Sequence, residues 1–303
     1  MKKIPLLIVY ILVFCFSIFA FSGVRDLRAD DAGRVEYKLI KQWETEKELR
    51  VPESVLYDAS GNILYVSNIN GRPTEKNGRG FISKVSLDGK IEVLKWATGL
   101  NAPKGSAIHG NKLYVSDIDQ LVEIDLKTGK ILAKYPAAGA KFLNDVAADV
   151  SGNVYVTDMS SKNSVIYKLT QGKMTVWVKG REISNPNGLC MEERRLVVGN
   201  SGDGSLKAIN LADKKITTLT KVGSGIDGLR SDGQGNYFIS DWRGKTSMVT
   251  ASGQVIALID TTSSKINSAD LEYIKTKKLL LIPTFFDNRV VAYKVEDVAK
   301  SAE

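Results

Sequence analysis

Short runs of alternating apolar and polar residues repeat along this chain, and each run follows a turn rich in glycine and asparagine. In residues 225–242, Asp227 opens a short strand, a Gly/Asn turn reverses the chain, and residues 237–239 return it. The second residue of the returning strand recurs at intervals of 49, 41, 42, 41 and 43 residues. A repeating unit of this length predicts an all-β chain, a six-bladed β-propeller of four-stranded blades. The recurring residues are Tyr65, Tyr114, Tyr155, Val197, Phe238 and Leu281.

An outer hairpin of alternating strands with a polar or Gly-containing turn accompanies each of the first five repeats. The sixth repeat has a single outer strand, residues 290–295, and an alternating strand without a hairpin, residues 35–44, precedes the first repeat. We predict that this N-terminal strand completes the last blade, because that pairing joins the two ends of the chain and removes an open sheet edge. The five hairpins span residues 82–94, 122–133, 165–176, 206–218 and 248–257.

The first residues of the chain have the order of an export signal: two lysines, an uncharged apolar run over residues 4–21, and then Arg25. Ala20 and Ser22 are small residues suited to cleavage before residue 23. An uncleaved anchor is the alternative, because the run is just long enough to span a bilayer. We expect an exported protein, periplasmic or secreted. The predicted divisions are a signal peptide or anchor (1–22), a linker (23–34), the propeller (35–298) and a tail (299–303).

The charge and the numbers of cysteine and histidine residues limit which partners, disulfides and metals are expected. The formal charge is +8, but the lysines are scattered over strand ends and turns, so we expect no nucleic-acid binding. Without the signal segment Cys190 is the only cysteine, which excludes an intramolecular disulfide, and its sequence context is that of a buried apolar side chain. His109 is the only histidine, so a zinc site is poorly supported. We expect a monomer with no membrane contact beyond its N-terminal segment.

One polar residue opens the inner strand of each repeat, ten to twelve positions before the recurring residue. The inner strands of a propeller line its channel, so these side chains converge on one opening. Carboxylates crowded there repel one another, and a hard divalent cation with oxygen ligands relieves the repulsion; Ca²⁺ suits this set, or Mg²⁺ with more water. The six residues are Glu53, Lys104, Asn144, Asn187, Asp227 and Asp270.

The segments around these residues resemble the SMP-30/gluconolactonase/LRE-like family over about residues 53–295. The resemblance implies a calcium-dependent propeller with Glu53, Asn187 and Asp227 as ligands, and with Asn144 touching metal, bound water or substrate. Family hydrolases act on lactones and, in relatives, on phosphotriesters, and the carboxylate matching Asp227 serves there as general base or nucleophile. The motifs are Pro-Glu-Ser at 52–54, Asn-Asp at 144–145, Pro-Asn-Gly-Leu at 186–189 and Ile-Asp-Gly-Leu at 226–229.

This chain departs from the sugar-lactonase pattern at two places. The family arginine two residues before Asn144 is Phe142 here, and residues 160–164 lack the substrate-binding glutamate of the following loop. The apolar Phe142 favours a less hydroxylated ester or lactone. Lys104 is a cation among the ligand positions: it neutralises carboxylates, binds a substrate oxyanion, or points to solvent. We assign Phe142, Lys104 and Asp270 to substrate binding.

Two functional hypotheses follow. The first is an exported, divalent-metal-dependent hydrolase of a small-molecule lactone or ester, with Asp227 as the catalytic residue. The alternative is a non-catalytic, calcium-stabilised propeller that binds a ligand or a protein partner, since propellers are common binding platforms. The long loop at residues 68–80 leaves its strand at the same end of the ring as Asp227, where it either covers the central site or is a solvated insertion.

Overall fold

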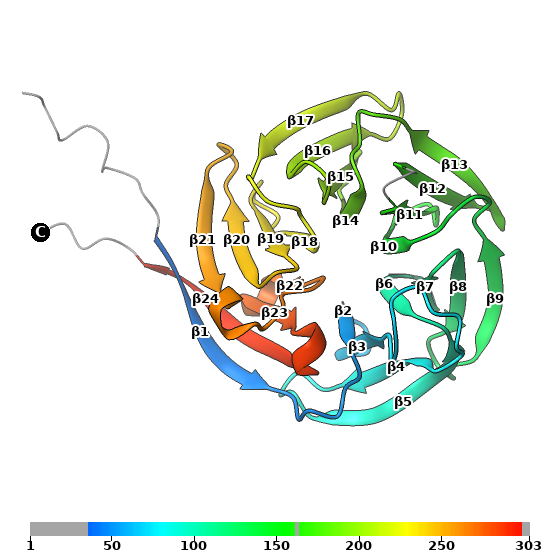
Figure 1. Ribbon diagram of the computed structural model, residues 1–303, viewed down its shortest axis with the longest axis horizontal. Helices are drawn as coiled ribbons and strands as arrows, with labels where there is room; N and C mark the ends of the chain where they lie inside the picture. The colour runs from blue at the N-terminus through cyan, green and yellow to red at the C-terminus, as the bar shows by residue number, and fades with distance from the viewer. Residues whose placement is uncertain (1–35, 161–163, 299–303) are drawn as a thin grey trace, which may run out of the picture.

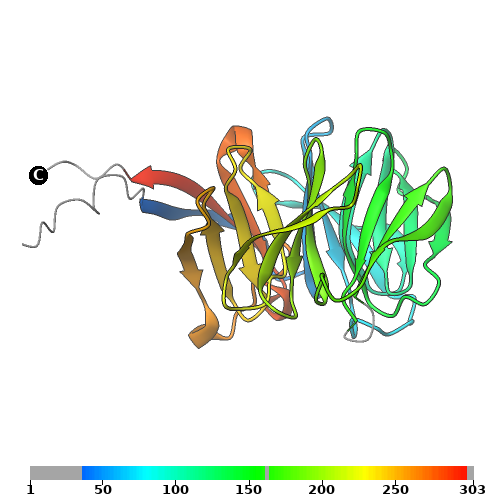
Figure 2. The same ribbon diagram turned by 90° about the horizontal axis from the view of Figure 1, so that it is seen from above.

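The computed structural model describes residues 36–160 and 164–298, and within them it is a ring of six four-stranded antiparallel sheets (Figure 1). This confirms the all-β, six-bladed propeller. The predicted signal peptide, linker and tail lie outside the described residues. Seen edge-on, the ring is a disc whose strands run between its two faces (Figure 2). Within the described residues no helix has the length and apolar character needed to cross a membrane.

Each blade runs from an inner strand beside the channel to an outer strand at the rim. The first blade contains β2 (Pro52–Asp58), β3 (Ile63–Asn68), β4 (Gly80–Val85) and β5 (Ile91–Leu100), and the second contains β6 (Pro103–His109), β7 (Lys112–Asp117), β8 (Gln120–Asp125) and β9 (Ile131–Pro136). The third contains β10 (Leu143–Ala148), β11 (Val154–Asp158), β12 (Val165–Thr170) and β13 (Lys173–Lys179), and the fourth contains β14 (Pro186–Met191), β15 (Arg195–Asn200), β16 (Ser205–Asn210) and β17 (Ile216–Lys221).

The last two blades complete the ring. The fifth contains β18 (Leu229–Ser231), β19 (Tyr237–Asp241), β20 (Lys245–Val249) and β21 (Val255–Asp260), and the sixth contains β22 (Glu272–Ile274), β23 (Leu279–Pro283), β24 (Val290–Val298) and β1 (Glu36–Glu44). Three short 3-10 helices lie in the same described part of the chain: η1 (Thr262–Ser264), η2 (Lys275–Lys277) and η3 (Phe285–Asp287).

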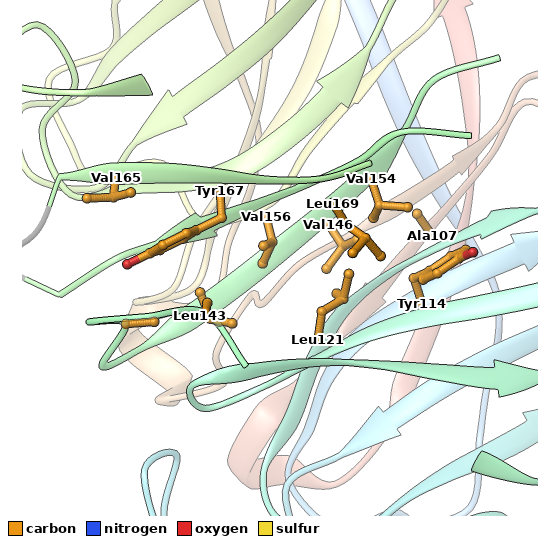
Figure 3. Close-up of a cluster of buried hydrophobic side chains, with 12 residues drawn as sticks. Ala107, Tyr114, Leu121, Leu143, Val146, Val154, Val156, Val165, Tyr167 and Leu169 are labelled. Carbon is orange, nitrogen blue, oxygen red and sulfur yellow. The ribbon is translucent and has the colours of Figure 1, made fainter. Parts of the chain in front are cut away.

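Alternation along each strand explains how the blades pack. Successive side chains of a strand point to opposite faces of its sheet, and both faces of a blade meet a neighbouring blade. In β3, Leu64 and Val66 therefore pack toward the sixth blade, whereas Tyr65 packs toward the second. Figure 3 shows the cluster between the second and third blades, where Tyr114 and Val146 contribute from the two sides. The core is thus divided into layers between blades.

The N-terminal strand closes the ring. β1 pairs antiparallel with β24, with Leu39 opposite Val295, and the register shifts between Lys41 and Trp43. The two strands lie side by side at the ends of the colour range in Figure 1. The predicted closure by the N-terminal strand is confirmed, and the outer edge of the sixth blade is covered because a strand from the other end of the chain pairs with it.

The inner strands surround a central channel. We call the end at which they begin the upper mouth and the end at which they finish the lower mouth. Glu53 lies at the start of β2, near the upper mouth, whereas Leu56, further along the same strand, lines a cavity of about 580 Å³ at the lower mouth. Cys190 and Arg230 also line the lower cavity. Burial raises the pKa of the partly buried Cys190 thiol to about 11, so it is not a reactive thiolate at neutral pH.

Candidate functional site

The polar residues at the beginnings of the six inner strands gather at the upper mouth. Each blade supplies one, and all six are at most 6% exposed. Asp227 directly precedes β18, and Asp270 is held against β2 by a bridge to Ser54. Five of the six line one cavity of about 470 Å³: Glu53, Lys104, Asn144, Asn187 and Asp227. Asp270 is directed instead toward Arg230.

Glycines beside these residues let the inner strands approach closely. A Cβ on Gly188, next to Asn187, would lie 2.5 Å from the backbone oxygen of Asp227. A Cβ on Gly228, next to Asp227, would lie 2.5 Å from the backbone nitrogen of Leu271. Any side chain there would push neighbouring blades apart at the channel. The Asn-Gly and Asp-Gly pairs therefore serve the geometry of the site as well as its chemistry.

Asn144 and Asn187 are held with their amide nitrogens already bonded. The Nδ2 of Asn187 donates to Asp227 Oδ1 at 2.5 Å and to Met159 Sδ at 3.1 Å, and the Nδ2 of Asn144 donates to the same sulfur at 3.3 Å. The amide oxygens are therefore the groups that remain to accept a bond. Met159, which follows β11, thus orients both amides.

Each of the four predicted metal ligands has one buried oxygen that accepts no hydrogen bond from any described residue. A buried polar atom without a partner costs about 1–3 kcal/mol, so four around one cavity require an explanation. A cation with oxygen ligands would satisfy all four. The atoms are Glu53 Oε2, Asn144 Oδ1, Asn187 Oδ1 and Asp227 Oδ2.

The donor set fits a hard cation better than zinc. Among residues 36–160 and 164–298, no three His, Cys, Asp or Glu side chains lie close enough together to hold a metal by themselves. Two carboxylates and two amide oxygens suit Ca²⁺, which takes six to eight oxygen ligands and completes its shell with water, or Mg²⁺ with more water. Zinc prefers nitrogen and sulfur, and His109 lies at the far end of β6.

Burial dominates the electrostatics of the two carboxyl groups. It raises the pKa of Glu53 well above its ordinary value, and repulsion from Asp227 adds to that shift. Burial likewise raises the pKa of Asp227 from 3.8 to about 7, while the hydrogen bond from Asn187 opposes the shift. Without a cation, these carboxyl groups therefore stay protonated at pH values at which ordinary carboxyl groups have lost their protons.

Lys104 is buried, so the interpretation that it points to solvent is wrong. The residue is 1% exposed because β6 directs its side chain into the channel, where the Nζ lies 4.9 Å from the centre of the Phe142 ring. Its Nζ donates to the backbone oxygen of Ala102 at 3.0 Å, the one hydrogen bond that it makes to the described residues. Burial lowers the pKa of Lys104 to about 8, and the charge of Glu53 opposes the shift. Glu53 forms no ion pair with it within 4.0 Å.

Asp270 belongs to a second cluster of charges next to the site. Arg230 of β18 lies 3.5 Å from Asp145, 3.7 Å from Asp270 and 3.5 Å from Glu272, measured from guanidinium nitrogen to carboxylate oxygen. It therefore links the third, fifth and sixth blades across the channel. The sequence pattern identified Arg230 only as a strand residue, because nothing near it in the chain indicates its partners.

An aromatic wall, formed by Trp242, Phe285 and Phe286, lines the same upper cavity and was not predicted. The ring centres lie 5.4 Å apart for Trp242 and Phe285, 6.0 Å for Trp242 and Phe286, and 4.8 Å for the two phenylalanines. The loop at residues 68–80 contributes Ile69 and Pro73 to the lining, and Phe142 lines it as expected. The only sequence signal for the wall was a pair of phenylalanines at the end of a strand.

Comparison with known proteins identifies the family. The sequence model described as the SMP-30/Gluconolactonase/LRE-like region matches residues 51–271. The chain belongs to this family. The match spans all four motifs that carried the resemblance, so the family prediction is confirmed. A search of curated proteins found no match.

Solved structures share the fold at low sequence identity. One is a nidogen/laminin complex, with 18% identity, a TM-score of 0.59, and coverage of 69% of this chain and 80% of that chain. Another is a catalytically inactive virginiamycin B lyase from Staphylococcus aureus with quinupristin, with 13% identity, a TM-score of 0.58, and coverage of 86% of this chain and 99% of that chain. These likenesses concern the fold alone.

Proposed function

We propose that this family member is an exported, divalent-metal-dependent hydrolase of lactone or ester type, with Ca²⁺ or another divalent cation such as Mg²⁺ at the upper mouth. Glu53, Asn144, Asn187 and Asp227 would hold the ion. The observation that carries the proposal is the set of four buried oxygens without partners among the described residues, all from side chains lining one cavity. A divalent cation supplies Lewis acidity toward a carbonyl oxygen.

Asp227 is the proposed catalytic residue. Its Oδ1 accepts the hydrogen bond from Asn187, so the carboxylate is held in one orientation, from which it could accept a proton as a general base. Asp227 would take a proton from water as the water oxygen bonds to the carbonyl carbon. When the bond from that carbon to the ester oxygen breaks, Asp227 would return the proton to the departing oxygen. One water is consumed, and an alcohol and an acid are formed.

The cavity supports a small and largely apolar substrate. Its volume of about 470 Å³ is in the range of small-molecule sites. Phe142, Ile69 and Met159 line it, and Phe142 stands where sugar lactonases of the family carry an arginine. A substrate covered with hydroxyl groups would leave those groups without partners against such walls.

Calorimetric titration of Ca²⁺ into chelator-treated protein tests the metal, with Asp227→Ala beside it. One-to-one binding in the parent that is lost in Asp227→Ala supports the site; no binding of Ca²⁺ or Mg²⁺ to the parent overturns it. The matched control is Asp241→Asn, because Asp241 lines the same cavity but is not a proposed ligand; it should keep binding.

A panel of lactones and aryl esters then tests catalysis. Asp227→Asn should lower turnover by about 10²–10⁴-fold, the usual contribution of general acid–base catalysis, without loss of the fold. Unchanged turnover in this variant would remove Asp227 from the catalytic role. Metal binding without turnover of any member of the panel would favour the calcium-stabilised binding propeller.

A further inference from the structure

A buried cation with spare hydrogen-bond donors lies in the upper cavity. The ammonium group of Lys104 has three N–H donors, and the hydrogen bond to Ala102 uses one of them. The residue is 1% exposed, and no carboxylate of the described residues lies within 4.0 Å of its Nζ, although the charges of Glu53 and Asp117 act on it from further away. Burying an ammonium group with no carboxylate in direct contact is unfavourable, so this arrangement is suited to a ligand that places an anion against the two spare donors.

An aromatic surface with no complete protein cover lies in the same cavity. Phe286 is 64% exposed and Trp242 is 41% exposed, although large aromatic side chains are usually well buried. Their rings are already held edge-to-face against Phe285, which is buried. The wall is therefore built in advance of any ligand, and an apolar group packing on it would lose little further freedom on binding.

The two features lie on different sides of the ring. Lys104 belongs to the second blade, whereas Trp242 follows β19 of the fifth blade, and in a ring of six these blades are opposite each other (Figure 1). The four unpartnered oxygens come from the first, third, fourth and fifth blades. A ligand that reaches from Lys104 to the wall would therefore cross the proposed metal site.

We propose that the upper cavity binds aryl-alkyl carboxylates, with the carboxylate paired to Lys104 and the aromatic group packed against Trp242, Phe285 and Phe286. The inference deepens the proposed function and rests on it for the reaction, because hydrolysis of an aryl-bearing lactone or ester yields such a carboxylate. It names the substrate class as aryl-bearing esters and lactones. Lys104 is then the residue that receives the acid half of the product.

Three probes separate the two ends of the ligand. 3-Phenylpropanoate has both the carboxylate and the ring, 3-phenylpropanamide keeps the ring without the charge, and gluconate has a carboxylate on a polar chain. Each is titrated calorimetrically into the Ca²⁺-loaded protein and into Lys104→Met and Phe286→Ala. The control variant is Leu132→Ala, which truncates a half-exposed apolar residue of β9 that does not line the cavity.

The parent and Leu132→Ala should bind 3-phenylpropanoate at least about tenfold more tightly than the amide or gluconate, because a hydrogen bond to a charged group contributes about 1.5–3 kcal/mol and 1.4 kcal/mol is a factor of ten. Lys104→Met should weaken the binding of 3-phenylpropanoate by about tenfold or more and leave the binding of the amide unchanged. Phe286→Ala should weaken the binding of both aryl ligands by about two- to tenfold, which corresponds to the usual free energy of an aromatic pair.

Two outcomes would overturn the inference: equal binding of 3-phenylpropanoate by the parent and Lys104→Met, or tighter binding of gluconate than of 3-phenylpropanoate. The first would mean that the carboxylate does not use Lys104. The lactone and aryl-ester panel, run on the same samples, keeps this result separate from the proposed function. Turnover without Lys104-dependent binding removes the inference alone, and Lys104-dependent binding without turnover removes the hydrolase alone.

Discussion

The channel contains two groups of buried carboxylates, which we call its two levels: one surrounds Arg230 and the other faces the upper cavity. They differ in how their negative charge is compensated. In the cluster around Arg230, which reaches from the starts of the inner strands to the lower cavity, the chain supplies its own cation: Arg230 lies 3.5–3.7 Å from the carboxylates of Asp145, Asp270 and Glu272. At the upper mouth, Glu53 and Asp227 have no ion pair to a cation of the described residues, and each has an oxygen without a partner. The first group has an internal cation, although one guanidinium serves three carboxylates and both oxygens of Asp270 accept no hydrogen bond from the described residues; the second group has no such cation within 4.0 Å.

We interpret the first group of charges as structural and the second as the proposed ligand site. A buried carboxylate that meets a guanidinium of the same chain stabilises the folded state only through the pair, and the pair leaves little capacity for an external ion. A carboxylate that faces a cavity can still bind an external ion. Without the ion it lowers the free energy of unfolding, and binding of the ion offsets that loss. The two groups should therefore respond differently to mutation, to metal and to pH, with the largest effect on stability expected at Arg230 and the smallest at Lys104.

The largest effect is expected where the internal cation is removed. Arg230→Met leaves Asp145, Asp270 and Glu272 buried without their counter-charge, so the free energy of unfolding should fall by about 3–5 kcal/mol, the usual cost of breaking a buried pair. Urea denaturation measures it. Lys275→Met is the matched control, because Lys275 is an exposed residue lining the same lower cavity. A loss below about 1 kcal/mol in Arg230→Met would show that the cluster is not a structural unit.

Addition of metal should act on the upper level alone. Ca²⁺ at one hundred times its dissociation constant should raise the free energy of unfolding of the parent by about 2.7 kcal/mol, because the ion binds the folded state and not the unfolded one. The gain should vanish in Asp227→Ala, which removes a proposed ligand, and persist in Asp241→Asn. An equal gain in the parent and Asp227→Ala would place the stabilising ion elsewhere.

The response to pH follows from the raised pKa of Asp227, about 7 in the folded protein against an ordinary 3.8. Between these pH values the folded state binds a proton that the unfolded state has lost. The free energy of unfolding of the metal-free, chelator-treated protein should therefore decrease as pH rises from about 4 to about 7. Ca²⁺ affinity should rise through the same interval, by up to about tenfold per pH unit for each proton displaced. Urea midpoints and calorimetry at pH 5, 6, 7 and 8 measure both, and a pH-independent affinity would contradict the prediction.

The smallest effect on stability is expected for Lys104→Met. Lys104 has no carboxylate within 4.0 Å to lose, and methionine keeps an unbranched apolar side chain beside Phe142, so the free energy of unfolding in urea should change by less than about 1 kcal/mol. Arg230→Met and Lys104→Met both replace a buried cation of the channel by methionine, and the difference between them measures the contribution of paired charge. Similar losses in the two variants would remove the distinction between the levels.

Much of the architecture could be predicted from local patterns. The recurring unit around Tyr65, Tyr114 and their equivalents predicted the blades, and the unpaired strand at residues 35–44 predicted the closure, because both depend on alternation and turns that are close in the chain. The four proposed ligands were found in the same way, since each lies at a fixed distance from a repeated strand. Their place on one cavity confirms the convergence, and the metal itself stays a prediction.

Other features depended on residues that are distant in the sequence. Lys104 was compatible with three environments until the packing of β6 beneath Phe142 placed it in the interior. Trp242 and Phe285 come from different blades, so no local pattern joins them into a wall. Asp270 has the sequence context of a ligand position, but its neighbour in space is Arg230.

The sequence by itself determined the strands, their number, the order of the blades and the type of residue offered at the upper mouth, because backbone propensity, alternation and turn chemistry act over a few residues. Only the tertiary structure decided which charges are paired and which face a cavity. That choice depends on side chains from blades that are not neighbours, such as Arg230 of the fifth and Asp145 of the third, brought within a few ångströms by closure of the ring. The division between carboxylates that meet an internal cation and carboxylates that face a cavity is therefore a property of the folded ring.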